Sequence, residues 1–127
     1  MNKSLLIQNG VHLEDHEYQT IKLLLEFGFS IELIPVSLTK GVHTPDIIID
    51  GVFWEMKSPT GGSKNTIKHT MQNAAHQARN IIIDLRRCKL PQEAAINEIK
   101  YRFQLSKRII HIMIITKDLK LIDLNSK

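Results

Sequence analysis

The sequence has 127 residues, 43% of them hydrophobic and 24% charged, with a net charge of +4 from 17 basic and 13 acidic side chains. These values predict one domain over residues 1–127 and exclude a disordered tail, a coiled coil and a collagen-like repeat. The lone Cys88 excludes an internal disulfide and a cysteine-built zinc site, apolar runs of four or five residues exclude a membrane span, and residues 1–9 lack a signal-peptide pattern.

The first element predicted along the chain is a helix over residues 13–27, where apolar side chains recur at helical spacing and Gly28 follows as a stop. Strands are predicted over 30–35, 46–50 and 52–58, a helix over 65–79 and a strand over 80–85. A third helix follows from Pro91 to about residue 105, then strands over 108–116 and 119–124. This order predicts an α/β fold with a mixed central sheet flanked by helices.

Asp50-Gly51, between two apolar runs, predicts a two-residue hairpin turn. Counting back from the turn pairs Ile47 with Trp54 and Asp46 with Glu55. Because side chains alternate along a strand, one face of the hairpin is apolar and is expected in the core. That face carries Ile47, Ile49, Val52, Trp54 and Met56, and the other carries Asp46, Ile48, Phe53, Glu55 and Lys57.

The predicted pairing places the carboxylates of Asp46 and Glu55 opposite each other, with β-carbons roughly 5 Å apart. Their repulsion calls for compensation by a shared proton, by Lys57 or by a divalent cation. Two carboxylates holding a cation beside a lysine suit phosphodiester cleavage, and oxygen ligands favour Mg²⁺ or Mn²⁺. An ordinary solvated sheet face remains the alternative.

Pro45-Asp46, followed after eight residues by Glu55-Met56-Lys57, resembles the signature of the PD-(D/E)xK nucleases. The order of helix, three strands, helix and strand is similar to the core of that superfamily. A more specific resemblance links the chain to the C-terminal tRNA-nuclease domains of CdiA contact-dependent growth-inhibition toxins. It covers roughly residues 13–116 and is carried by the blocks 44–59, 61–67 and 80–85, with Glu17-x-x-Thr20, Gly28 and Pro35 upstream.

The resemblance implies metal-dependent cleavage of tRNA in the cytoplasm of a target cell, and neutralisation by a cognate immunity protein. It implies that Asp46 and Glu55 are metal ligands and that Lys57 is catalytic. Glu17 would be the helix-borne acid that completes the cluster, with Glu14 as its competitor. CdiA proteins are very long, so the chain is either a domain of a secreted toxin or a short stand-alone homologue.

Basic residues concentrate in the second half of the chain: residues 1–63 carry four basic and eight acidic side chains, whereas 64–127 carry thirteen and five. Lys64 and Thr66, at the start of the second predicted helix, are the chosen phosphate-binding residues. His69 and Gln72 on that helix are further substrate-binding candidates, and His76 joins His69 in an alternative metal-free acid–base mechanism. A metal-dependent DNase and a non-catalytic nucleic-acid-binding module remain the rival functions.

Overall fold

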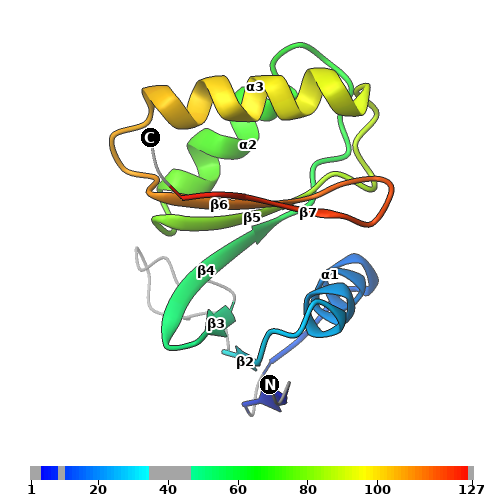
Figure 1. The fold of residues 1–127 in the computed structure, drawn as a ribbon, viewed down its shortest axis with the longest axis vertical. Coiled ribbons are helices and arrows are strands. Elements are labelled where there is room, and N and C mark those ends of the chain that lie inside the picture. The colour runs from blue at the N-terminus through cyan, green and yellow to red at the C-terminus, as the bar shows by residue number, and fades with distance from the viewer. Residues whose placement is uncertain (1–3, 9–10, 35–46, 126–127) are drawn as a thin grey trace.

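The computed structural model describes residues 4–8, 11–34 and 47–125. Within these ranges the chain forms a seven-stranded sheet with helices on both faces (Figure 1). The helices are α1 (Asp15–Glu26), α2 (Thr66–Ala75) and α3 (Gln92–Leu105). The strands are β1 (Leu5–Ile7), β2 (Ile31–Leu33), β3 (Ile47–Ile49), β4 (Val52–Lys57), β5 (Asn80–Asp84), β6 (His111–Ile115) and β7 (Leu121–Leu124).

The strands lie in the sheet in chain order, and their directions are mixed. β1 and β2 are parallel, β2, β3 and β4 are successively antiparallel, β4, β5 and β6 are parallel, and β7 is antiparallel to β6. The predicted α/β fold with a mixed sheet is therefore confirmed. None of the helices in the described ranges is long and apolar enough to cross a membrane.

Strand β1 was not predicted, because three exposed apolar residues carry no periodic signal. Its position beside β2 is fixed by backbone hydrogen bonds, among them Ile31 N–H to Ser4 O at 2.8 Å. Helix α2 ends at Ala75, four residues before the predicted end. The chain turns there, since Gln77 N–H bonds to Ala74 O at 2.9 Å and the Arg108 side chain donates to Ala75 O.

The hairpin has the predicted turn and the predicted register. Asp50 and Gly51 have φ values of 51° and 80°, the left-handed pair of a type I′ turn, and Ile47 pairs with Trp54. The prediction that the whole apolar face of the hairpin lies in the core is wrong at Val52, because 43% of this residue is exposed. The tip of the hairpin extends past the part of the sheet that α1 covers, so the strand is buried only further along (Figure 1).

Each face of the sheet has its own core. Helix α1 covers one face, where Leu24 packs with Trp54 and Ile82. Helices α2 and α3 cover the other face, where Ile81 and Ile83 belong to the core (Figure 1). Alternate side chains of β5 thus enter opposite cores, which explains why this strand is apolar at successive positions.

Candidate active site

The candidate site is built around Glu55 and Lys57 on β4. Their neighbours Trp54 and Met56 lie in the core under α1, so strand alternation directs Glu55 and Lys57 to the face of α2. The sequence determines this arrangement through the hairpin turn, which fixes which residues of β4 point to which face. The two predicted residues therefore share one face of a central strand.

Glu55 and Lys57 form an ion pair in which Lys57 Nζ lies 3.1 Å from Glu55 Oε2. The Glu55 residue is 3% exposed, whereas the Lys57 side chain is 24% exposed. The carboxylate is thus held away from water, and the ammonium group reaches the surface beside it. A buried charge is retained in a fold only with such partners, because its desolvation is unfavourable.

Lys57 opens into a hollow of about 380 Å³ that it shares with Asn73, His76 and Gln77 of α2 and the turn after it. His69 lies one helical turn before Asn73, so helical spacing places it on the same side of α2 as Asn73 and His76. The ammonium group, the two amides and the imidazole that line the hollow can together bind a phosphate. The hollow is therefore a suitable place for a polyanion beside the Glu55–Lys57 pair.

The metal cluster that the sequence predicts is not assembled by the described residues. Among them, no three His, Cys, Asp or Glu side chains gather closely enough to hold a metal. Asp46 lies outside the described residues. Glu55 has the oxygen donors that Mg²⁺ and Mn²⁺ prefer, so it fits one position of such a site.

The structure places Glu17 in the first turn of α1, where its Oε1 accepts a hydrogen bond from Glu14 N–H at 2.9 Å. Glu14 is the N-cap, and its side chain completes the reciprocal capping box while 75% of it is exposed. Helix α1 packs on the face of the sheet opposite Glu55. The described contacts therefore give both acids a capping role and do not join Glu17 to the Glu55–Lys57 pair.

The two predicted phosphate-binding residues at the start of α2 differ in their surroundings. Lys64 is exposed in the loop just before the helix. The Thr66 hydroxyl accepts a hydrogen bond from Ser63 N–H at 3.1 Å, and a Cβ on Gly61 would come within 2.6 Å of it. Thr66 thus fixes the glycine loop, and Lys64 presents an exposed positive charge.

Gln72 lies three residues after His69 on α2 and does not line the hollow beside Lys57. It lines a separate pocket between α2 and α3, together with Lys68 and Arg102. The non-core side of α2, which the sequence presents as one surface, is therefore two: one toward β4 with Asn73 and His76, and one toward α3 with Lys68 and Gln72.

A buried polar cluster at the end of β5 was missed from the sequence. Asp84 is 3% exposed and accepts hydrogen bonds from Thr20 Oγ1 at 2.6 Å and from Arg86 Nη2 at 2.8 Å. Burial alone raises the pKa of Asp84, but the hydrogen bonds from Arg86 and Thr20 outweigh it and hold the pKa below its ordinary 3.8. The signal was an aspartate that ends an apolar strand and is followed, after Leu85, by two arginines.

The fold and the site define an α/β domain with a glutamate–lysine pair on a central strand. The family model for the contact-dependent growth inhibition CdiA C-terminal domain matches residues 43–121. The chain belongs to this family, as its resemblance implied.

Among solved structures, the chain is similar to one from a CdiA-CT/CdiI toxin and immunity complex of Burkholderia pseudomallei. The TM-score is 0.71 at 19% sequence identity, and the match covers 96% of this chain and 98% of that one. This likeness shows a shared fold. A comparison with curated proteins gives no match.

Proposed function

We propose that this CdiA C-terminal domain is a toxin that cleaves tRNA in a reaction dependent on Mg²⁺ or Mn²⁺. The observation that carries the proposal is the buried Glu55 with Lys57 Nζ at 3.1 Å, on the strand that follows the hairpin turn. An acid and a lysine two residues apart on one strand face are the second half of the PD-(D/E)xK pattern. That superfamily assignment remains a prediction, as does the role of Asp46.

In this proposal Glu55 and Asp46 would hold the metal, with Glu17 as the third predicted ligand. When bound, the metal would neutralise charge on the phosphate and lower the pKa of a coordinated water. The ligand role of Glu17 requires its carboxylate to leave the capping hydrogen bond with Glu14 and to reach the metal from the face of the sheet opposite Glu55.

Lys57 has the clearest role among the described residues. Its ammonium group is kept in place by Glu55 and faces the hollow beside α2. A phosphodiester in this hollow gains negative charge as the nucleophile attacks, and a fixed ammonium group stabilises that charge most where water is scarce. Lys57 therefore stabilises the transition state, and Lys64, Thr66, His69 and Gln72 are proposed to bind the rest of the substrate.

The choice of tRNA as the substrate is supported by the family resemblance, whereas charge alone supports any polyanion. Residues 64–110 carry ten lysines and arginines against three acids, which suits RNA and DNA equally. A protein partner is also proposed. The Burkholderia relative was solved with an immunity protein, and a cytotoxic nuclease needs a cognate inhibitor in the cell that makes it.

The test is cleavage of total tRNA and of plasmid DNA by the purified protein, with Mg²⁺ and with a chelator. We expect tRNA cleavage that the chelator abolishes, and a loss of about a hundredfold or more in Lys57→Ala. The matched control is Lys120→Ala, which removes an exposed lysine beside Asp118, away from β4, and is expected to cleave normally.

Three results contradict parts of the proposal. Degradation of DNA with tRNA left intact identifies a DNase. Cleavage that survives the chelator and is lost in His69→Ala or His76→Ala identifies acid–base chemistry without a metal. Binding of RNA without any cleavage identifies a non-catalytic module.

A further inference from the structure

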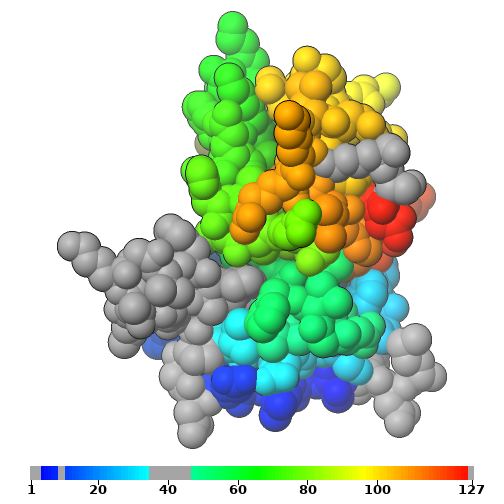
Figure 2. Space-filling model, turned by 90° about the vertical axis from the view of Figure 1, so that its left-hand side faces the viewer, coloured from blue at the N-terminus to red at the C-terminus, as the bar shows by residue number. Residues whose placement is uncertain are grey.

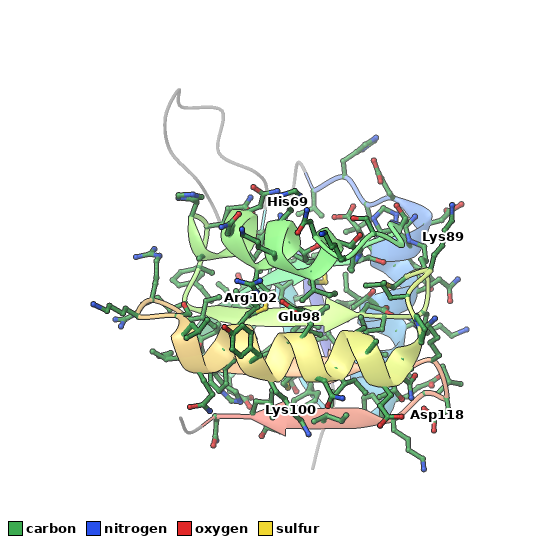
Figure 3. All side chains as sticks on the ribbon, turned by 90° about the horizontal axis from the view of Figure 1, so that it is seen from above. His69, Lys89, Glu98, Lys100, Arg102 and Asp118 are labelled. Atoms are coloured by element: carbon green, nitrogen blue, oxygen red, sulfur yellow. The ribbon has the colours of Figure 1, made fainter. Side chains whose placement is uncertain are left out.

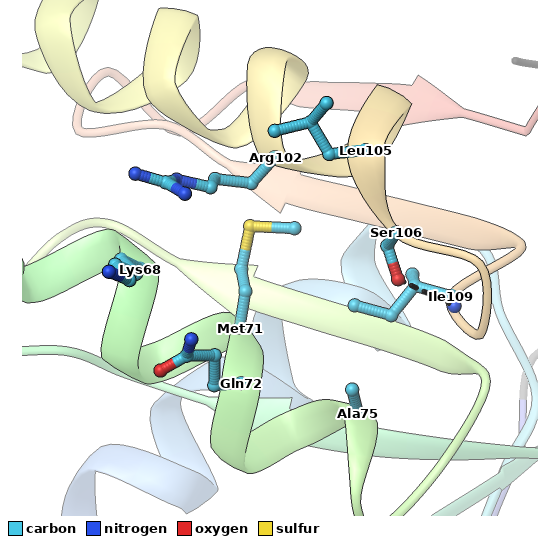
Figure 4. A pocket seen from close by; sticks show the side chains of 8 residues that line it. All are labelled: Lys68, Met71, Gln72, Ala75, Arg102, Leu105, Ser106 and Ile109. Carbon is cyan, nitrogen blue, oxygen red and sulfur yellow. Dashed lines mark hydrogen bonds between the residues drawn. The ribbon is translucent and has the colours of Figure 1, made fainter.

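The pocket between α2 and α3 is a slot with apolar walls and a charged rim. It has a volume of about 230 Å³, and Met71, Ala75 and Leu105 form apolar parts of its lining. Lys68 and Gln72 stand on its α2 side and Arg102 on its α3 side (Figure 4). Figure 2 shows α2 and the end of α3 side by side on one face of the molecule.

The Arg102 side chain is held in place at the slot. Its Nε donates to Glu98 Oε2 at 2.6 Å, one helical turn earlier, and its guanidinium carbon lies 5.4 Å from the ring centre of Tyr101. Figure 3 shows Glu98 and Arg102 on the side of α3 that faces α2, whereas Lys100 points to the side of β7. A positioned guanidinium can stack on a flat ring while its other N–H groups bind a phosphate.

The slot combines the requirements of one nucleotide. A base has a flat apolar face and a polar edge, and it is joined to an anionic phosphate. Met71 and Leu105 fit the face, Gln72 fits the edge, and Lys68 and Arg102 fit the anion. Helix α2 contains no acidic residue, so nothing on that wall repels a phosphate.

We propose that this slot binds an unpaired base of the RNA substrate, with the adjoining phosphate on Lys68 and Arg102. The inference rests on the proposed function, because RNA is the ligand that the nuclease proposal supplies. The slot and the hollow beside Lys57 lie on different sides of α2, and a helix with its side chains is roughly 10 Å across. The base bound in the slot would therefore belong to a nucleotide beside the cleaved bond, and it would select where the strand is cut.

The test measures binding without cleavage, in a chelator, using a labelled single-stranded RNA and the fully paired duplex of the same sequence. Ala75→Leu fills the slot and leaves every charge in place. We expect it to weaken binding of the single strand about tenfold and to leave binding of the duplex unchanged, because only unpaired bases enter a slot. The matched control is Ala94→Leu, the same substitution at an exposed position of α3.

A second pair of variants tests the slot independently, in case Ala75→Leu does not fold. Arg102→Gln is expected to weaken binding of the single strand several-fold, and Lys100→Gln, which removes one charge from the other side of α3, is expected to have a smaller effect. Thermal melting establishes which variants are folded.

Equal single-strand affinity in wild type, Ala75→Leu and Arg102→Gln would overturn the slot, and so would equal weakening of single strand and duplex. A wild-type protein that binds no RNA would overturn it as well. The cleavage assay tests the nuclease proposal separately. If the protein binds unpaired bases in the slot but cleaves no RNA, the slot proposal is supported and the nuclease proposal is refuted.

Discussion

Replacing Asp84 by asparagine tests the buried cluster that joins α1 to the end of β5. The substitution keeps the shape of the side chain and removes its charge. In the native structure Asp84 accepts from Arg86 Nε at 3.0 Å, from Arg86 Nη2 at 2.8 Å and from Thr20 Oγ1 at 2.6 Å. Asparagine has one side-chain oxygen, and an amide NH₂ group takes the place of the other. At least one N–H donor of Arg86 would therefore face an N–H donor instead of an acceptor.

We expect the free energy of unfolding to fall by about 3 kcal/mol. Breaking a buried ion pair typically destabilises a protein by about 3–5 kcal/mol. We use the lower end of this range because the Arg86 side chain is 23% exposed, so water can solvate its charge when the partner is lost. In a domain of this size, the change corresponds to a fall in Tm of roughly 10 °C.

The pH dependence gives an independent check of the same cluster. Because the folded-state pKa of Asp84 is lowered, its contribution to stability is complete above the unfolded pKa and is lost as the pH falls through the folded pKa. The stability difference between wild type and Asp84→Asn should therefore be constant from pH 7 to about pH 5 and shrink below about pH 4.

Urea unfolding followed by circular dichroism measures both effects. Asp15→Asn is the matched control, since it makes the same change at an exposed position of α1 and should stay within about 0.5 kcal/mol of wild type. An Asp84→Asn protein as stable as this control, or a stability difference that grows toward acid pH, would refute the reasoning.

Two further substitutions test the hairpin and the core under α3. Gly51→Ala should lower the free energy of unfolding by about 1 kcal/mol in the same urea assay, because Gly51 has a φ of 80° that strains any residue with a Cβ; no loss would mean that the turn is not type I′. Ile99→Ala, at a fully buried position of α3, should cost about 2–5 kcal/mol, whereas exposed Ile110→Ala should cost much less; equal losses would place Ile99 outside the core.

The parts of the fold that the sequence predicts well are those governed by local rules. Asp50-Gly51 dictates a turn with two left-handed residues, and the turn then fixes the register that places Glu55 and Lys57 on one face. Strand β1 could not be predicted, because its three exposed residues form a strand only through pairing with β2.

The parts of the site that the sequence did not predict depend on packing between distant elements. Thr20 and Asp84 are 64 positions apart, and only the docking of α1 against β5 brings them together. Glu17 shows the converse: an acid three residues after Glu14 fits a capping box as well as a metal ligand, and the structure uses it in the capping box. Sequence spacing alone does not separate these two roles.

Helix α2 connects the two proposals physically. Its apolar residues Ile67 and Met71 belong to the core with β5 and α3, so the helix cannot turn about its axis. Helical periodicity then requires Asn73 to face Lys57 while Gln72 faces α3. A base bound on one side of α2 would consequently hold the strand at a fixed offset from Lys57 on the other. In such an arrangement, the position of the cut depends on the rigidity of one ten-residue helix.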